Sequence, residues 1–301
     1  MYQNPRAVVI ILLMFGASLA FADEPGTGGV EPVVTPPTEA SRQEQAPVSG
    51  STLNPYGLPA EGFIGPTFEG PWRFRAALNG WLPTTINISI KAGGESGSTT
   101  EGLDWLVARL DYLAPFNGEV RKGSFGFFAH TFFFKVHGTR DTELARINWN
   151  DEGFWIDTGL SYELGRWALG DGPRAPELTI EPFVAARLIR QSVELDFRRV
   201  DIEDDTNAVS TYVPIIGLRT FWDLTEHWNL QFEGDYGGFG VGDNHQTWHA
   251  LGLVGYRWPG WGLHWNVQAG YRALRVFDLR TSNYEAREDV FGPNLMLSVD
   301  F

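Results

Sequence analysis

Two histidines and one aspartate, His245, His249 and Asp235, are the residues of the C-terminal third best suited to chemistry. If this stretch forms strands, period-two alternation puts both histidines on one strand face, near the end of the strand that would lie outermost. A carboxylate beside a histidine can orient the ring as a general base that activates water or a serine. The sequence shows no accompanying nucleophile motif, so solvated loop histidines are the plainer interpretation.

A second candidate site is the acidic run of Asp201, Glu203, Asp204 and Asp205. Hard cations prefer several oxygen ligands, so the run could hold a divalent ion that bridges lipopolysaccharide phosphates. Its spacing differs from that of a dedicated calcium loop, and a solvated acidic surface loop is the alternative. No cofactor is predicted.

The elements that must position these residues are strands, as the C-terminal segment shows most clearly. From 290 to 301 the apolar face carries Phe291, Leu295 and the terminal Phe301, while Asp300 lies on the opposite face. Such alternation is typical of a strand with two different environments. Aromatic residues bracket the apolar faces of the preceding segments, as in the interfacial girdles of lipid-facing strands. The pattern predicts an all-β fold, a transmembrane antiparallel up-and-down β-barrel.

The same alternation, read along the chain, predicts about ten strands, with eight or twelve as alternatives. The segment between the first two, from 84 to 110, is Gly- and Ser-rich and is interpreted as a long loop with a short helical piece in GLDWLVARL. The predicted strands begin at Trp72 and are 72–82, 111–121, 125–137, 147–164, 178–197, 211–222, 228–239, 246–258, 263–278 and 290–301.

The face opposite the aromatic residues is rich in charge and would line the lumen. Ionised groups far from bulk water must be paired, and the two signs are nearly balanced, which favours an interlocking plug. A polar channel is the alternative, but a barrel of about eight strands is filled by its own side chains, whereas open channels typically need about 16 to 18. We expect Glu233 and Asp235 to pair with Arg257 and Arg272. The predicted lumenal residues are Arg73, Arg75, Glu119, Asp157, Glu163, Glu181, Arg187, Arg219, Glu233, Asp235, Arg257, Arg272 and Asp300.

Composition narrows the class of protein further. The formal net charge is -14, which argues against a nucleic-acid partner because phosphate binding needs clustered Lys and Arg. The chain has no cysteine, so disulfides, thiol nucleophiles and thiolate metal sites are excluded.

The N-terminal part of the chain divides into two segments ahead of the barrel at 72–301. Residues 1–22 combine Arg6, the apolar run AVVIILLMF and an Ala-Phe-Ala site, which is typical of an export signal cleaved after Ala22. Residues 23–71 hold nine of the 18 prolines and few aliphatic residues, which predicts a disordered acidic periplasmic tether.

We expect the mature protein to begin at Asp23 and residues 23 to about 70 to be sensitive to protease, because this composition cannot offset its ordering entropy by burial. Intact-mass analysis and limited proteolysis check both points. A different N-terminus, or a prefix that survives the protease, would contradict the prediction.

The run GDYGGFGVGDNHQTWHALGLVGYRW, followed by GYRAL, resembles a family of uncharacterised proteobacterial outer-membrane β-barrel proteins. The resemblance covers 72–301 and implies fold and location in the outer membrane, but no activity. The long Pro-rich prefix and GLDWLVARL depart from the family pattern. The predicted partners are outer-membrane lipid, lipopolysaccharide and, through the strand that ends at Phe301, the barrel assembly machinery.

Three functions follow as hypotheses. The first is a non-enzymatic outer-membrane barrel with a plugged lumen and a role in envelope structure or surface interaction. The second is an outer-membrane hydrolase, either an omptin-like protease or a lipid A-modifying enzyme, with a His/Asp site at the rim. The third is a narrow pore for small solutes.

Overall fold

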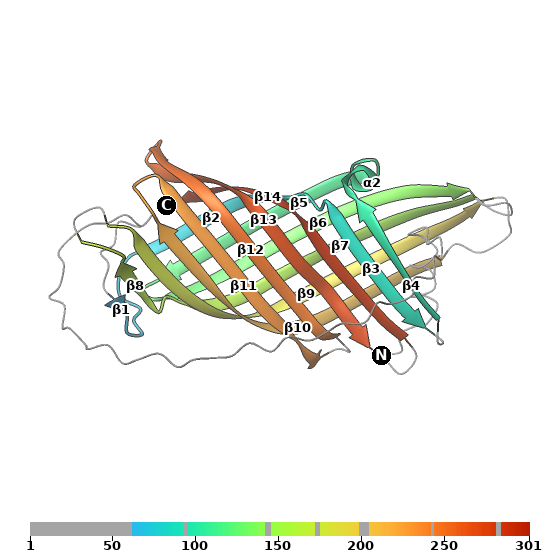
Figure 1. Ribbon diagram of the computed structural model, residues 1–301, viewed down its shortest axis with the longest axis horizontal. Helices are drawn as coiled ribbons and strands as arrows, with labels where there is room; N and C mark the ends of the chain where they lie inside the picture. Colours follow the sequence, from blue (N-terminus) through green and yellow to red (C-terminus); the bar gives the residue numbers. More distant parts are fainter. Residues whose placement is uncertain are drawn as a thin grey trace, which may run out of the picture.

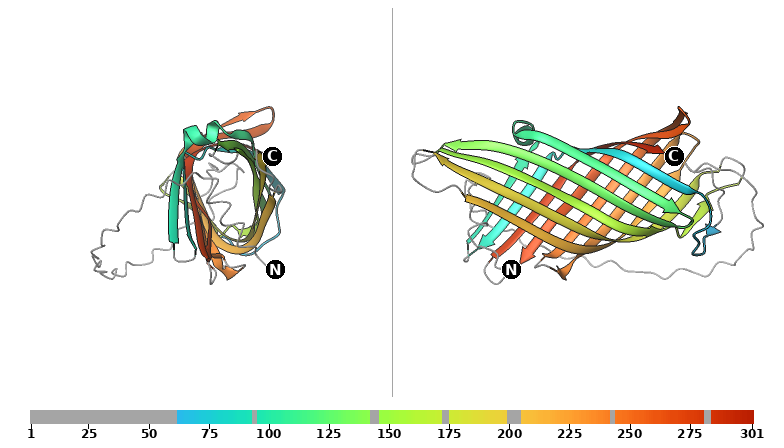
Figure 2. Two further views of the ribbon diagram at one scale, coloured as in Figure 1. Left: turned by 90° about the vertical axis from the view of Figure 1, so that its right-hand side faces the viewer. Right: turned by 180° about the vertical axis from the view of Figure 1, so that it is seen from behind.

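The computed structural model describes residues 62–92, 95–141, 146–171, 175–198, 205–241, 244–280 and 284–301. Ten antiparallel strands form a closed ring, since β14 pairs with β2 and β7 pairs with β9 (Figures 1 and 2). The predicted fold class is therefore confirmed. The strands of the ring are β2 (Trp72–Trp81), β5 (Leu110–Lys122), β6 (Phe125–Asp141), β7 (Arg146–Tyr162), β9 (Glu177–Arg198), β10 (Asp205–Asp223), β11 (Trp228–Val241), β12 (Asn244–Gly260), β13 (Leu263–Arg280) and β14 (Tyr284–Asp300).

The two faces of the sheet differ as the alternation predicts. Large apolar side chains cover the outer face, where Leu160, Tyr212 and Leu295 are each about 60% exposed. The inner face holds buried charged and amide side chains such as Glu181 and Gln268. Apolar side chains thus lie outside, where lipid can cover them, and polar side chains lie inside, where they bond to one another. This is the reverse of a water-soluble protein and is what a membrane-spanning barrel requires. No helix in the described part of the chain is long and apolar enough to cross a membrane.

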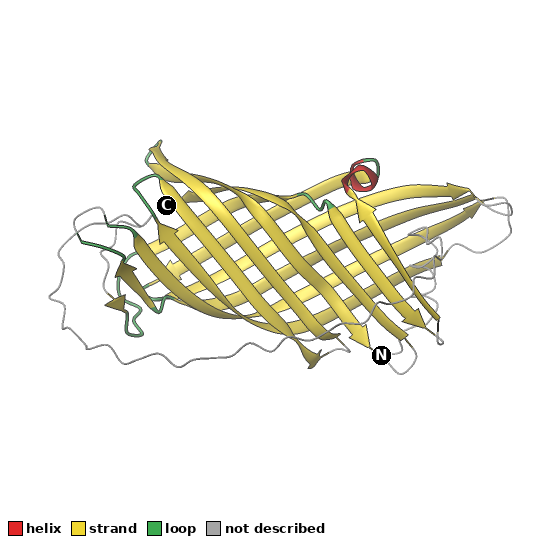
Figure 3. Cartoon of the chain, viewed as in Figure 1, coloured by secondary structure: helices red, strands yellow, loops and turns green. Residues whose placement is uncertain are grey.

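A hairpin extends the wall at one end of the barrel. β3 (Thr85–Ala92) continues the line of β2 along β14, and β4 (Glu95–Gly102) folds back on β3. The helical piece predicted in GLDWLVARL is confirmed as α2 (Leu103–Val107), which appears as the red coil in Figure 3. The interpretation of the Gly- and Ser-rich stretch as a loop is wrong, since it forms β3 and β4. These strands form because the free edge of β14 pairs with β3.

The other end of the barrel is crossed by residues 62–71, which the sequence assigned to the tether. There β1 (Gly62–Phe63) pairs with β8 (Gly165–Ala168), and the amide of Thr67 donates to the hydroxyl of Ser124 at 3.0 Å. We call this the periplasmic end, since the short turn at Gly123 and the C-terminus lie there and short turns face the periplasm in such barrels. Residues 1–61, and with them the predicted export signal and most of the tether, lie outside the described residues.

A closed ring of hydrogen-bonded strands has no free edge strand at which unfolding in detergent can begin. We therefore expect the protein extracted from membranes to migrate differently in gels before and after boiling. Identical mobility under both conditions, with the protein in the soluble fraction, would contradict the barrel.

Candidate functional site: the barrel lumen

The lumen receives the charged residues that alternation assigns to the inner face. All thirteen predicted lumenal side chains are buried or half-buried there, because each has the strand parity opposite to the lipid-facing aromatic residues. Sequence reasoning missed six other charged side chains that are equally buried, and four of them, Arg121, Arg166, Glu177 and Asp223, lie near the periplasmic ends of their strands, while Asp151 and Asp278 lie farther along the barrel. The positions of the first four near strand ends suggested turns, but Arg121 shares its parity with Glu119 and could have been found by that signal.

One group of ion pairs crosses the lumen near its periplasmic end. Arg121 Nη2 lies 2.6 Å from Glu119 Oε1, Arg121 Nη1 lies 3.3 Å from Glu163 Oε2, and Arg121 also contacts Glu181. Arg219 Nη1 lies 2.9 Å from Glu119 Oε2, and its Nη2 lies 3.3 Å from Glu181 Oε1. Because β5 is separated from β9 and β10 in the ring by β6 and β7, the contacts of Arg121 with Glu181 and of Arg219 with Glu119 span the interior. Arg121 and Glu119 lie on the same strand, and Arg219 and Glu181 lie opposite each other on neighbouring strands.

A second group lies farther along the barrel. Arg187 makes a two-pronged contact with Asp157, with both N–O distances 2.8 Å, and its Nη2 lies 3.0 Å from Asp235 Oδ2. Asp235 stands opposite His249 in the ladder between β11 and β12. The distance from His249 Nδ1 is 3.2 Å to Asp235 Oδ2 and 3.8 Å to Glu233 Oε1. The group thus joins an arginine, three carboxylates and one imidazole.

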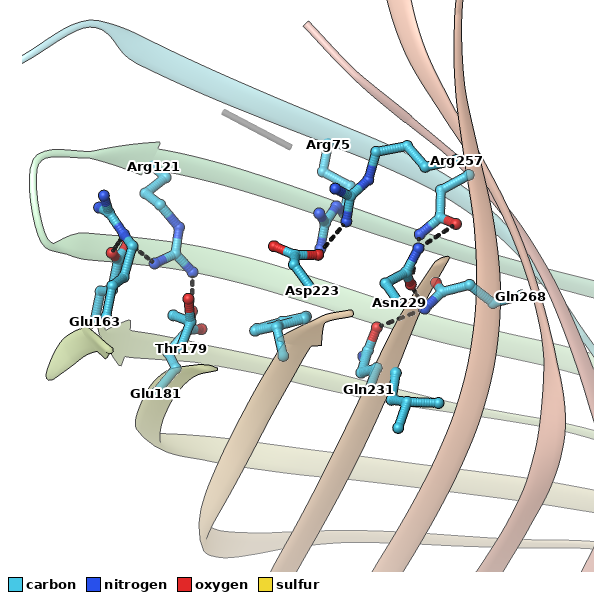
Figure 4. A pocket seen from close by; sticks show the side chains of 14 residues that line it. Arg75, Arg121, Glu163, Thr179, Glu181, Asp223, Asn229, Gln231, Arg257 and Gln268 are labelled. Carbon is cyan, nitrogen blue, oxygen red and sulfur yellow. Dashed lines mark hydrogen bonds and ion pairs between the residues drawn. The ribbon is translucent and has the colours of Figure 1, made fainter. Parts of the chain in front are cut away.

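A polar chamber lies between the first group and the wall formed by β11, β12 and β13 (Figure 4). Side-chain amides line it and bond to one another, with Asn229 Nδ2 donating to Asn266 Oδ1 at 3.1 Å and Gln268 Nε2 to Gln231 Oε1 at 3.3 Å. Its cavity volume is about 30 Å³. That volume holds only about two water molecules, so side chains fill most of this section.

Toward the opposite end, the lumen is filled by apolar and aromatic side chains. Trp81 is fully buried, and its ring meets those of Phe132 and Trp155 edge-on at centroid distances of 5.6 and 5.7 Å. Phe132 and Trp155 stack at 4.1 Å, and Leu274 of the same cluster stands opposite His249 in the ladder between β12 and β13. An apolar plug therefore adjoins the charged groups on their outer side.

The structure brings together two of the three predicted catalytic residues. His249 and Asp235 meet, but His249 is buried in the lumen rather than exposed at the rim, because its parity matches Thr247 and Leu251 on the inner face. The side chain of His245 lies outside the described part of the chain. A hydrolase substrate would have to reach His249 past the apolar cluster or through the cross-lumen ion pairs.

Two other predictions are resolved differently. The expected pairing of Arg257 with Glu233 and Asp235 is wrong. Glu233 stands opposite Leu251, which precedes Arg257 by six residues on β12. Arg257 Nη2 instead binds Asp223 Oδ1 at 2.6 Å. Arg272 stands opposite Leu251 in the ladder between β12 and β13, and its guanidinium interacts electrostatically with Glu233. Of the predicted metal loop, 201–204 lie outside the described residues and Asp205 begins β10, with its side chain not described.

Comparison with known proteins gives likeness in fold alone. No model of a known protein family matches the chain, and no curated protein sequence matches it. Among solved structures it is similar to the outer-membrane protease OmpT from Escherichia coli, with 11% identity, a TM-score of 0.43 and coverage of 79% of this chain and 99% of that one. It is also similar to the attachment invasion locus protein Ail of Yersinia pestis, with 6% identity, a TM-score of 0.29 and coverage of 75% and 97%.

The closed ring, the lipid-facing exterior and the charged interior define an outer-membrane β-barrel protein. Within that class, this chain is a barrel of ten strands whose lumen is filled by three successive layers, namely an ion-pair network, a charged group with one imidazole, and an aromatic cluster.

Proposed function

We propose that the protein is a non-enzymatic outer-membrane barrel with a side-chain-plugged lumen and a role in envelope structure or surface interaction. The observation that carries the proposal is a pair of ion contacts, Arg121 with Glu181 and Arg219 with Glu119, each of which joins strands that are not neighbours in the ring. A pore would use such groups as separate wall charges that attract ions. Here Glu181 is held by Arg121 and Glu119 by Arg219, each from across the interior, so these carboxylates are neutralised and the side chains close the section between them.

Two further observations support a plug over a pore or a hydrolase. The polar chamber has room for only about two waters in its 30 Å³. The stacked rings of Phe132 and Trp155 occupy the section beyond it, where a solute path would have to run. The contact between Asp235 and His249 has the chemistry of an oriented base, but it lies between these two fillings.

The proposal includes how the protein reaches and sits in the membrane. Export with cleavage after Ala22, a periplasmic tether ahead of the barrel, and contact with outer-membrane lipid and lipopolysaccharide all belong to it. So does recognition by the barrel assembly machinery through the last strand. In support, Phe301 pairs with Phe74 through N–O distances of 3.0 and 2.9 Å, so the terminal residue lies at the seam that closes the ring. The resemblance to the uncharacterised barrel family marked by GGFGVG belongs to the proposal as well.

Reconstitution of the purified full-length protein in planar lipid bilayers tests the plug directly. We expect small or undetectable single-channel conductance, with a porin reconstituted in parallel as the positive control. Steady, large conductance from the unmodified protein would show that the lumenal residues line a pore. Peptidase or lipid A hydrolase activity that His249→Ala abolishes would instead establish the hydrolase.

A further inference from the structure

We propose that Glu233, Asp235 and His249 form a binding site for a divalent transition-metal ion of the Zn²⁺ class inside the lumen. One carboxylate oxygen from each acid and one imidazole nitrogen, all buried, lie within 4.8 Å of one another. Neighbouring strands supply these ligands, since Glu233 and Asp235 are two residues apart on β11 and His249 stands opposite Asp235 on β12. The sheet itself therefore fixes their spacing.

The distances between the candidate ligand atoms suit a tetrahedral ion. Bonds of about 2.0–2.2 Å to nitrogen and oxygen place two tetrahedral ligands roughly 3.3 Å apart. His249 Nδ1 lies 3.2 Å from Asp235 Oδ2 and 3.8 Å from Glu233 Oε1. All three ligand atoms lie within 4.8 Å of one another, so an ion could bind among them after the two carboxylates rotate toward it.

Glu233 turns one oxygen toward an arginine and the other toward His249, whereas Asp235 Oδ2 faces both Arg187 and His249. Asp235 Oδ2 receives Arg187 Nη2 at 3.0 Å, while Glu233 Oε2 lies 3.9 Å from Arg219 Nε. Asp235 Oδ1 is buried and has no hydrogen-bond partner among the described residues. A buried carboxylate oxygen without a partner is costly, and an ion would satisfy it. Arg187 would then hold Asp235 in place through its hydrogen bond, as partners of metal ligands do, and Arg219 would act on Glu233 through its charge.

The charge of the lumen allows a cation despite these arginines. Among the described residues there are nine buried carboxylates and seven buried arginines. Asp151, for example, is buried with only the amide of Gln191 bonded to it at 2.8 Å. A buried excess of negative charge is costly, and one divalent ion would offset an excess of two.

The site would be structural rather than hydrolytic. Three protein ligands leave one position for a water, which also occurs in catalytic zinc sites. However, Leu274, which belongs to the apolar cluster, stands opposite His249 in the ladder, so apolar side chains rather than a substrate path adjoin the site. His249 Nε2, which would carry the ring proton when Nδ1 binds the ion, has no hydrogen-bond partner among the described residues. The ion would cross-link β11 to β12 and stabilise the barrel.

The test uses full-length protein refolded in detergent after treatment with a chelator, to which Co²⁺ is added as a coloured substitute for Zn²⁺. We expect about one ion per chain, the intense visible absorption of tetrahedral cobalt, and its loss when Zn²⁺ is added. His249→Gln and Glu233→Gln should each abolish the absorption. His264→Gln is the matched control, because His264 is an exposed histidine on the neighbouring strand, and it should bind as the unmodified protein does.

Heat-modifiable mobility, measured on each variant, separates loss of binding from loss of folding. If His249→Gln does not fold, Glu233→Gln decides the question. Absence of binding by the folded unmodified protein would overturn the site, and so would binding that survives in a folded His249→Gln or Glu233→Gln variant.

Discussion

Replacing Arg121 with leucine is expected to lower the stability of the barrel by about 3–5 kcal/mol, the usual cost of leaving a buried charge without its partner. Arg121 is 3% exposed and contacts Glu119, Glu163 and Glu181. Its loss would leave Glu119 and Glu181 with Arg219 as their shared ion-pair partner and would remove one of the three arginines around Glu163, so the negative charge of this group would be only partly compensated. We expect water to enter to solvate these charges, so the variant should also conduct cations measurably.

The measurements are urea unfolding of the refolded protein in lipid vesicles and single-channel recording in planar bilayers. Lys122→Leu is the matched control, because Lys122 is the next residue on β5 and lies over the ring of Trp72 at 4.8 Å, on the opposite face of the strand. Its effect on stability should stay below about 1 kcal/mol, as for other surface charges. Equal unfolding midpoints for Arg121→Leu and Lys122→Leu would show that the cross-lumen pairs do not stabilise the barrel.

Replacing Trp81 with alanine should cost a similar amount, about 3–5 kcal/mol, but for a different reason. The Trp81 side chain is fully buried and packs edge-on against both Phe132 and Trp155, and the guanidinium of Arg272 lies 5.4 Å from its ring centroid. Truncation would remove these contacts and leave a cavity the size of an indole in the apolar plug. The cavity would adjoin Arg272, which is charged, so water is expected to fill it.

Urea unfolding of Trp81→Ala measures the loss, and the control is Trp72→Ala on the same strand. Trp72 is 57% exposed on the lipid-facing side, so its truncation leaves the lumen unchanged. A smaller loss for Trp81→Ala than for Trp72→Ala would mean that lipid contact, rather than packing of the lumen, holds this part of the barrel together.

Strand number and strand face could be predicted from the sequence, because both depend on a local rule. Successive side chains of a strand point to opposite faces, so a chain between lipid and a polar interior must alternate. The apolar face of Leu295 and the polar face of Asp300 were therefore identifiable within one segment. The same rule predicted that Glu119, Arg187 and Arg219 face inward, where the structure buries them or half-buries them.

Elements that depend on a distant partner could not be predicted in this way. The Gly- and Ser-rich stretch that forms β3 and β4 has weak strand propensity, and it forms a hairpin because the outer half of β14 gives β3 eight consecutive partners. Likewise Gly62 and Phe63 form β1 only because β8 lies beside them at the periplasmic end. Tertiary pairing outweighs local propensity in both places.

The sequence by itself determined which residues are charged and that they face the lumen, since parity requires nothing beyond the strand to which a residue belongs. Only the tertiary structure decided their partners. Register and curvature bring Arg121 of β5 to Glu181 of β9, and they set Arg257 against Asp223 rather than Glu233. The physical reason is that a pair across the interior depends on how strands tilt and stagger as the sheet closes, and these are properties of the whole ring.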